Sequence, residues 1–525
     1  MKAENFPTSN LPPEESQTCN CNRSCWIGVF AIFLLLIGIT GLTITCFVLE
    51  QKVLQSSYHY GVVFDAGSTH TGITIYRWPV GYKNHGTALI DQLASETCSD
   101  AGITSYEHEP EMAGEMIKKC IDNVVLRLLS QHAIKKTAIY FGATAGMRLL
   151  CERDQEACYL IEESIRRNLN KYKFRETKNR VKILTGNEES AFGWISANIV
   201  NGALLKEMPP KSNPYLVGSL DMGGGSAEIA FIPENITIPE KYSSKLSLYG
   251  LDYTLYTHSY LCFGFKEAQR RLMANLLEAS NFSRKVIYPC WQKGYNETIS
   301  AASIWLSPCS VRPKSMIFPL SNTTAYNFVG NGSSSACLNR IKELFYNTTC
   351  QFGTCSFDGV FQPPLRGHFM AFSGYGHVGT FFNITKGDAI SEIKTKGDDF
   401  CKKDWSQVSK DYPNIITKFL KNYCFESLYS YGFLTSGLHF KPESNDVHIR
   451  KEDDGTQIGW SLGFMVNATN SVAVEEPSYR LSRQEYIALL TFCCLVIMLG
   501  LAMLIGCFIK RRVENKTYKY SRIEK

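Results

Sequence analysis

Two segments of the sequence place an aspartate at the end of an apolar run and follow it with a turn of glycine, serine or threonine. The first begins at Asp65 and has the sequence DAGSTHTG; the second begins at Asp221 and has the sequence DMGGGS. Because glycine has no Cβ, the N–H groups of such a turn can approach a phosphate closely and converge on it. Either turn alone is also compatible with an ordinary tight hairpin.

Together, the two turns predict a site that grips a chain of phosphates from both sides. Hard divalent cations such as Mg²⁺ typically use one or two carboxylates with water and phosphate oxygens, so Asp65 and Asp221 are candidates for holding such an ion. The alternative is that each aspartate only initiates its turn. The turn residues that would contact phosphate are Gly67, Ser68, Thr69, Gly223, Gly224, Gly225 and Ser226.

A third acidic feature, the pair Glu188 and Glu189, precedes a helical run in a glycine-containing turn. Phosphoryl transfer to water needs a group that orients and deprotonates the water, and a glutamate that points into a cleft can do this. Acidic residues in a first helical turn also stabilise the helix dipole. The pattern does not decide between these interpretations.

Other catalytic motifs are absent or weak. The sequence has no GxxxxGK[ST], GxSxG or HExxH, which argues against a P-loop enzyme, a serine esterase and a zinc protease. Gly374, Gly376 and Gly379 do spell GxGxxG, but a dinucleotide-binding domain is not expected so late in a cysteine-rich stretch.

The segments that carry these residues alternate between strand-like and helix-like patterns. Residues 60–78 and 215–233 each have the pattern of strand, turn and strand, whereas 137–150 and 181–202 have the pattern of strand, turn and helix. The alternation predicts an α/β fold with a mixed or parallel sheet. The repeated hairpin predicts two related lobes that face each other.

Two apolar segments, 26–49 and 486–509, contain no Lys, Arg, Asp or Glu, and each is long enough to cross a bilayer. The first exceeds the apolar core of a signal peptide and lacks a small-residue cleavage site, so we expect an uncleaved anchor. Basic residues follow the second segment at once. The positive-inside rule therefore places both tails, 1–25 and 510–525, in the cytosol.

The net charge of +6 is concentrated in 510–525, where basic residues face anionic lipid, and it gives no support to nucleic-acid binding. Cys19, Cys21 and Cys25 precede the first span and are candidates either for palmitoylation or for unmodified thiols.

The chain between the two spans has the composition of an oxidising, glycosylating compartment. It carries twelve cysteines, which predict about six disulfides. It also carries eight Asn-x-Ser/Thr sites, at Asn235, Asn281, Asn296, Asn322, Asn331, Asn347, Asn383 and Asn467.

Five blocks of sequence, taken together, resemble the ecto-nucleoside triphosphate diphosphohydrolases, or apyrases, of the actin and Hsp70 superfamily, in particular the members with two membrane anchors. The blocks are DAGSTHTG at 65–72, GATAGMRLL at 142–150, TGNEESAFGW at 185–194, DMGGGSAE at 221–228 and GWSLGFMVN at 459–467. The resemblance implies two RNase H-like lobes with a central cleft. Lobe I would comprise 58–182 and 440–475, and lobe II 183–439.

The same resemblance implies a reaction, in which water removes the terminal phosphates of nucleoside tri- and diphosphates with the help of Ca²⁺ or Mg²⁺. Glu189 would be the catalytic base, and we expect Ser226 and Glu228 to help place the water. Asp65 and Asp221 would hold the metal, largely through water, with Trp460 nearby. The phosphate path would also include His70, Thr144 and Ala145.

The family's cysteine pattern implies five disulfides and leaves Cys151 and Cys158 as an extra pair. The implied pairs are Cys98 with Cys120, Cys262 with Cys309, Cys290 with Cys337, Cys350 with Cys355, and Cys401 with Cys424.

This chain departs from the family at several positions. Glu228 stands where the family has Gln beside the attacking water, and Ser190 replaces a Gly after the base. Tyr375 is the nearest candidate for stacking on the nucleobase, although the GYGH sequence around it shifts the family pattern. The extra charge of Glu228 leaves open a catalytically weak nucleotide-binding receptor or adhesion ectodomain, and a kinase-like member of the superfamily is a third hypothesis.

We expect a multi-pass plasma-membrane protein with an extracellular catalytic domain. The alternative is an endosomal or Golgi membrane with a luminal domain, because YSRI at 520–523 resembles a tyrosine-based sorting motif. A homo-oligomer formed through the membrane helices is left open.

Overall fold

The computed structural model describes residues 22–49, 58–80, 83, 85–177, 179–204, 216–312, 324–346, 348–385, 387–450, 458–472 and 483–521. Predictions on Cys19, Cys21, Asn322, Asn347 and the end of the YSRI motif lie outside these residues. The chain divides into two units, Tyr58–Glu475 and a unit made of the two terminal segments.

The larger unit begins with a five-stranded sheet in the order β3-β2-β1-β4-β5. The central strand β1 is antiparallel to β2 and parallel to β4. Val62, Val63 and Phe64 of β1 are fully buried, as expected for a strand covered on both faces. The strands are β1 (Tyr58–Ala66), β2 (Thr71–Pro79), β3 (Asp91–Ser99), β4 (Ala138–Ala143) and β5 (Val181–Ile183).

A second, six-stranded sheet has the order β14-β13-β6-β7-β9-β8 and repeats this plan. Its central strand β6 is antiparallel to β7 and parallel to β13, and β9 adds to the far side of β7. The two hairpins predicted from the sequence, β1-β2 and β6-β7, are therefore the equivalent parts of two related sheets. The strands are β6 (Gly218–Met222), β7 (Ser226–Phe231), β8 (Ser243–Leu248), β9 (Leu251–Leu261), β13 (Phe369–Ser373) and β14 (Val447–Ile449).

A small third sheet, in the order β10-β12-β11, belongs to the cysteine-rich part of the chain. Its strands are β10 (Lys285–Tyr288), β11 (Asn296–Ser300) and β12 (Ala325–Gly330). The described structure has the disulfides Cys98–Cys120, Cys151–Cys158, Cys262–Cys309, Cys290–Cys337, Cys350–Cys355 and Cys401–Cys424, which are the pairs that we expected.

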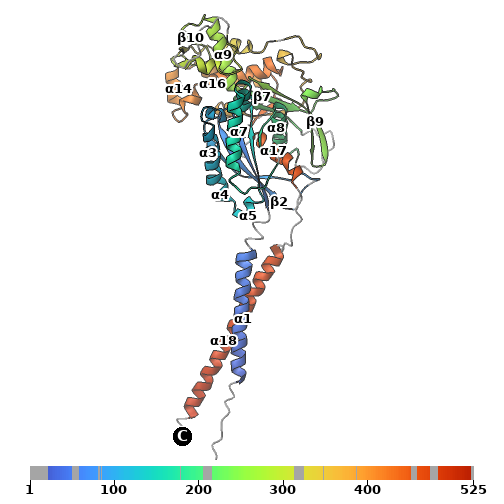
Figure 1. Cartoon of the computed structure of the whole chain (residues 1–525), viewed down its shortest axis with the longest axis vertical. Coiled ribbons are helices and arrows are strands. Elements are labelled where there is room, and N and C mark those ends of the chain that lie inside the picture. The colour runs from blue at the N-terminus through green and yellow to red at the C-terminus, as the bar shows by residue number, and fades with distance from the viewer. Residues whose placement is uncertain are drawn as a thin grey trace, which may run out of the picture. The chain divides into compact units, whose positions relative to one another are not determined.

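Helices cover both large sheets. In Figure 1, α3 and α7 lie side by side, and their apolar residues Ile117 and Ile161 share a core with Phe64 of β1. The helices of this unit are α3 (Pro110–Cys120), α4 (Leu126–Leu128), α5 (Gln131–Ile134), α6 (Ala145–Arg153), α7 (Gln155–Leu169), α8 (Gly186–Val200), α9 (Phe265–Ala279), α10 (Ala301–Trp305), α11 (Ser334–Lys342), α12 (Gly374–Phe381), α13 (Ile390–Cys401), α14 (Trp405–Asp411), α15 (Thr417–Leu420), α16 (Tyr423–Gly432) and α17 (Trp460–Ala468).

The segment 440–475, which the sequence analysis assigned to lobe I, is divided between the two halves of this unit. β14 joins the second sheet by pairing with β13, whereas α17 packs against α8 and contacts β1. The assignment of β14 to lobe I is therefore wrong, because this strand pairs with the sheet of the other half. The remaining lobe boundaries stay predictions.

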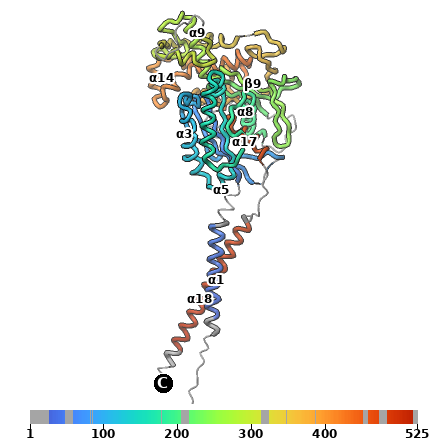
Figure 2. The backbone as a smooth tube through the Cα atoms, viewed as in Figure 1, coloured from blue at the N-terminus to red at the C-terminus, as the bar shows by residue number. Residues whose placement is uncertain are grey.

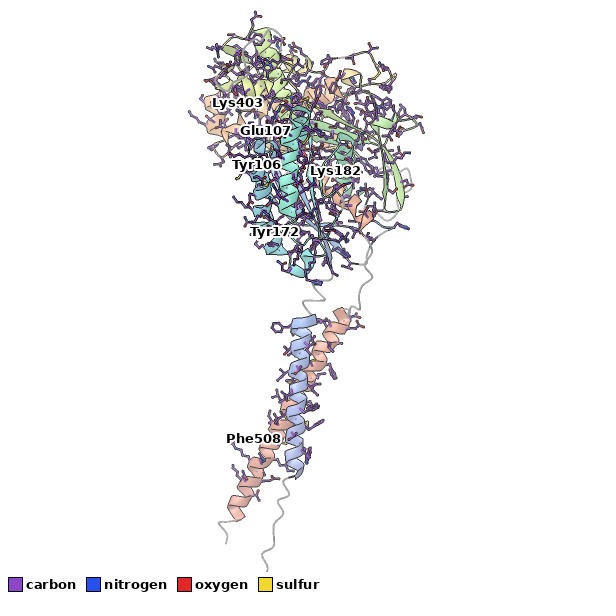
Figure 3. The ribbon with its side chains drawn as sticks, viewed as in Figure 1. Tyr106, Glu107, Tyr172, Lys182, Lys403 and Phe508 are labelled. Carbon is purple, nitrogen blue, oxygen red and sulfur yellow. A yellow bond between two sulfur atoms is a disulfide. The ribbon has the colours of Figure 1, made fainter. Side chains whose placement is uncertain are left out.

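The second unit consists of α1 (Asn22–Thr43) and its π-helical extension η1 (Ile44–Leu49), with α18 (Arg483–Ser521). Figure 2 shows α1 and α18 running side by side. Glycines allow the contact, because a Cβ on Gly38 would lie 2.6 Å from Ile497 and one on Gly500 would lie 2.9 Å from Leu35. The segments Trp26–Phe47 and Gln484–Thr517 are long and apolar enough to cross a membrane. Phe508 projects outward from α18 (Figure 3).

Candidate active site

The two glycine turns face each other. A Cβ added to Gly224 would lie 2.4 Å from Ser68 Oγ, and one added to Gly225 would lie 2.8 Å from the Ala145 Cβ at the start of α6. Ser68 also lies against Gly146, where a Cβ would be 3.1 Å from the Ser68 Cα. Three of the segments that the sequence analysis selected therefore meet at one place.

Both turns close with the same hydrogen bond. The Gly67 N–H donates to His70 O at 3.0 Å, and the Gly223 N–H donates to Ser226 O at 3.0 Å. These two N–H groups are therefore used within their own turns, although Gly67 and Gly223 were expected to contact phosphate. The N–H groups of the residues at the tips of the turns, such as Ser68 and Gly224, are the better candidates.

Asp65 and Asp221 occupy equivalent positions, each opposite the second strand of its hairpin. Burial raises the pKa of Asp65, whereas His70 and the Trp460 indole lower it. Burial also raises the pKa of Asp221 well above its usual range; Glu228 adds to this rise, and a hydrogen bond with Ser373 opposes it. At each aspartate, burial thus outweighs the groups that stabilise its negative charge.

The structure separates the roles of the adjacent glutamates. Glu188 forms a capping box with Thr185, in which the Glu188 N–H donates to Thr185 Oγ1 at 3.2 Å and Glu188 Oε2 accepts from the Thr185 N–H at 3.0 Å. Glu188 also pairs with Lys182, which is labelled in Figure 3. Glu188 therefore starts α8, while Glu189 is 7% exposed and points inward from the next position.

Arg148 on α6 joins this cluster, and the sequence analysis did not single it out. Its Nη1 lies 2.9 Å from Glu189 Oε2, and its Nη2 lies 3.7 Å from Glu228 Oε1 and donates to Ser226 Oγ at 3.1 Å. Glu228 also accepts a 2.7 Å hydrogen bond from Ser259. The only sequence indication was the position of Arg148 within the block at 142–150, since an arginine on a helix is more often a surface residue.

Neighbouring carboxylates add to the effect of burial on the pKa values of Glu189 and Asp221. Burial raises the pKa of Glu189 well above its usual range, Glu228 raises it further, and Arg148 lowers it. Burial raises the pKa of Glu228, against the lowering effect of Arg148. Buried negative charge of this density favours either protonation or a bound cation.

The residues present fit a divalent cation. Glu228 Oε2 is a buried oxygen with no hydrogen-bond partner in the described part of the chain, and Glu189 Oε2 is buried with the Arg148 guanidinium at 2.9 Å. Among the described residues, no three His, Cys, Asp or Glu side chains converge closely enough to hold an ion by themselves. The site therefore suits an ion whose coordination water and phosphate oxygens complete, as is common for Mg²⁺.

Other predicted residues occupy the periphery. Trp460 packs on Gly142, where a Cβ would lie 2.2 Å from its ring, and the adjacent Gly459 lies beside Asp65. Thr144 is buried at the start of α6. His70 is exposed, and its Nδ1 is 3.1 Å from Thr69 Oγ1.

Tyr375 does not lie where a stacking residue would be. Its side chain is 1% exposed and belongs to the larger apolar core, so neither face of its ring is open to a base. The GYGH sequence forms the first turn of α12, and His377 is the exposed side chain of that turn. The prediction for Tyr375 is therefore wrong, because the helix turns the tyrosine inward.

The chain is similar to known proteins over most of its length. The model of the GDA1/CD39 (nucleoside phosphatase) family matches residues 51–482. Ectonucleoside triphosphate diphosphohydrolase 8 of Gallus gallus is 36% identical over 90% of this chain and 96% of its own length. Ectonucleoside triphosphate diphosphohydrolase 1 of Mus musculus is 33% identical over 86% of this chain and 88% of its own length.

One solved structure supports the fold. A nucleoside triphosphate hydrolase from Neospora caninum superposes with a TM-score of 0.57 at 14% identity, over 83% of this chain and 95% of that chain.

Proposed function

Since the chain belongs to the GDA1/CD39 (nucleoside phosphatase) family, we propose that the cleft between its two glycine turns removes the terminal phosphates of nucleoside tri- and diphosphates. The enzyme is an apyrase-type hydrolase that depends on a divalent cation. The observation that carries the site assignment is that Ser68 lies against Gly224 and Ala145 against Gly225, at the start of the helix whose Arg148 pairs with the buried carboxylate of Glu189.

In the proposed reaction, Glu189 accepts a proton from the attacking water. Its raised pKa makes it a stronger base than an ordinary glutamate once it is ionised, and Arg148 stabilises the ionised form. Ser226 and Glu228 lie on the other side of the same guanidinium and help to place the water. The water attacks the terminal phosphorus in line with its bond to the departing nucleoside di- or monophosphate, and no covalent intermediate is needed.

The turn N–H groups bind the phosphate oxygens. They stabilise the negative charge that develops on these oxygens better than water would, because the fold already orients them before the reaction. Asp65 and Asp221, with Trp460 nearby, would hold Ca²⁺ or Mg²⁺ largely through water. When bound, such an ion would offset the negative charge of the terminal phosphates.

We further propose that the catalytic unit lies outside the cytosol, with the plasma membrane as the first choice of location and an endosomal or Golgi membrane as the second. Six disulfides support an oxidising compartment. Among the glycosylation sites that the structure describes, five have exposed asparagines, at Asn235, Asn281, Asn296, Asn331 and Asn383. Association through the membrane helices stays a prediction.

The test is phosphate release from ATP, ADP, UTP and UDP added to intact cells that express the full chain, with Ca²⁺ or Mg²⁺ and with a chelator. We expect release from both tri- and diphosphates that the chelator abolishes. No release above that of untransfected cells, with the protein present at the surface, would refute the proposal. Phosphate release only after the cells are permeabilised would indicate that the enzyme lies in an internal membrane.

A further inference from the structure

The second glycine turn rests on the start of one helix. Each of its three carbonyl oxygens accepts a hydrogen bond from a backbone N–H at or just before the start of α9: Gly223 from Phe265 at 3.0 Å, Gly224 from Glu267 at 3.1 Å and Gly225 from Cys262 at 2.9 Å. Gly264 permits this contact, because a Cβ there would lie 2.5 Å from the carbonyl carbon of Gly224. The turn and the helix are thus locked together through the backbone.

This arrangement fixes the direction of the N–H groups in the turn. In a planar trans peptide, the C=O and the N–H point in opposite directions. Because the carbonyls point to α9, the N–H groups of Gly224, Gly225 and Ser226 point away from it. Ser68 and Ala145 lie against Gly224 and Gly225, so we infer that these N–H groups face the phosphate cleft.

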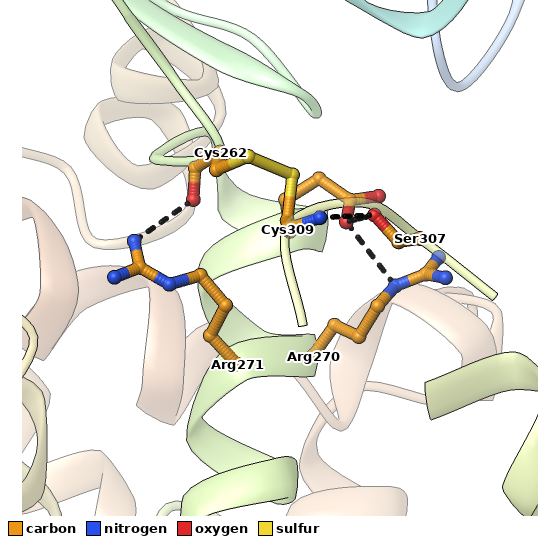
Figure 4. The surroundings of a disulfide bond; sticks show 6 residues. Cys262, Arg270, Arg271, Ser307 and Cys309 are labelled. Carbon is orange, nitrogen blue, oxygen red and sulfur yellow. Dashed lines mark hydrogen bonds and ion pairs between the residues drawn. A yellow bond between two sulfur atoms is a disulfide. The ribbon is translucent and has the colours of Figure 1, made fainter. Parts of the chain in front are cut away.

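The start of α9 is itself held by side chains in the cysteine-rich part of the chain (Figure 4). Glu267 is 5% exposed, and its Oε2 accepts a 2.6 Å hydrogen bond from Ser307 Oγ and lies 3.3 Å from Arg270 Nε. Ser307 Oγ also accepts from the Cys309 N–H at 3.2 Å. The Cys262–Cys309 disulfide joins this group to the residue that holds Gly225.

These contacts form a closed circuit. It runs from Gly224 through Glu267, Ser307 and Cys309 to Cys262 and back to Gly225. We propose that Glu267 and Ser307 are positioning residues for phosphate hydrolysis, which act at a distance by fixing the peptide planes of the second glycine turn. The inference rests on the proposed function of the cleft, and neither side chain touches the substrate.

Ser307→Ala tests this inference in the full-length protein, and Ser310→Ala is the matched control. Ser310 is a buried serine of the same segment whose Oγ has no hydrogen-bond partner in the described structure. We expect Ser307→Ala to lower kcat for ATP by about tenfold or more, because misdirected donors lose transition-state binding, and to change KM much less. Ser307→Thr keeps the hydroxyl and should restore kcat.

Hydrogen exchange gives a readout that does not depend on turnover. In Ser307→Ala, the backbone N–H groups of a peptide covering 262–270 should exchange faster than in the wild type and in Ser310→Ala, since their bonds to the turn open more often. Equal kcat and equal exchange in the two alanine variants would overturn the proposal. A wild type that releases no phosphate would refute the proposed function, while the exchange measurement would still test the circuit.

Discussion

The guanidinium of Arg148 lies 2.9 Å from the carboxylate of Glu189, the residue proposed to activate water. The same guanidinium contacts Ser226 and approaches Glu228. Arg148 therefore links α6 to the start of α8 and to the second hairpin. The positive charge of Arg148 is therefore shared by Glu189, Glu228 and Ser226.

Replacing Arg148 with Met should both destabilise and inactivate the protein. The change leaves Glu189 and Glu228 buried without their counter-charge, and breaking a buried ion pair costs about 3 kcal/mol or more. Thermal unfolding and phosphate release of the solubilised full chain measure the two effects. Adding Glu228→Gln to Arg148→Met should recover part of the stability, because one buried charge is removed; no recovery would contradict the shared ion pair.

Glu189→Gln should reduce phosphate release by about 10²- to 10⁴-fold, the usual contribution of a general base. The amide keeps the shape of the side chain but cannot accept the proton. Glu188→Gln is the control, since Glu188 serves the helix cap, and it should affect stability more than turnover. Near-normal turnover by Glu189→Gln, with normal surface expression, would remove Glu189 from the reaction.

Glu228→Gln should keep activity at neutral pH and extend it to lower pH. The negative charge of Glu228 raises the pKa of Glu189, so its removal lowers that pKa and leaves the base ionised in more acidic solution. The pH profile of kcat/KM checks this shift, with the exposed Glu278→Gln as control. An acid limb that stays in place or moves upward would show that Glu228 does not influence the base.

Gly224→Ala should weaken substrate binding, because its Cβ would lie 2.4 Å from Ser68 Oγ and would push the two turns apart. Gly72→Ala is the control, since a Cβ there would meet Glu96 O at an ordinary 3.6 Å. Measurements of KM and kcat for ATP should show a loss of about tenfold or more in kcat/KM for Gly224→Ala alone. Equal behaviour of the two variants would mean that the turns are further apart in solution.

The folded protein should lose stability in acid because His258 is buried in its neutral form. Burial, with a further effect of Lys241, lowers the pKa of His258 from its usual 6.5 to about 4, so the folded state binds this proton less readily than the unfolded state. The stabilisation is complete above pH 6.5 and is lost as the pH falls towards 4. The thermal midpoint should therefore fall less between pH 7 and 4.5 in His258→Gln than in the wild type or in the exposed control His132→Gln.

The local parts of the structure could be predicted from the sequence. An apolar run, an aspartate and a glycine turn specify a hairpin through backbone sterics and side-chain alternation alone, and both hairpins formed as predicted. The two apolar segments have no alternative to a long helix in a membrane, because a lipid-exposed backbone must satisfy its own hydrogen bonds. The family resemblance, rather than spacing, supplied the cysteine pairs.

Only the tertiary structure showed the different surroundings of the polar groups. Glu188 and Glu189 are adjacent in the chain, and they differ because the helix cap uses Glu188 while Glu189 is buried beside Arg148. Tyr375 points into the core because α12 begins at Gly374 and places Tyr375 on its buried face, whereas His377 is on the exposed face. The cap of Glu188 is a local contact with Thr185, whereas the pairing of Glu189 with Arg148 and the burial of Tyr375 depend on contacts between residues far apart in sequence, which no local pattern of residue types encodes.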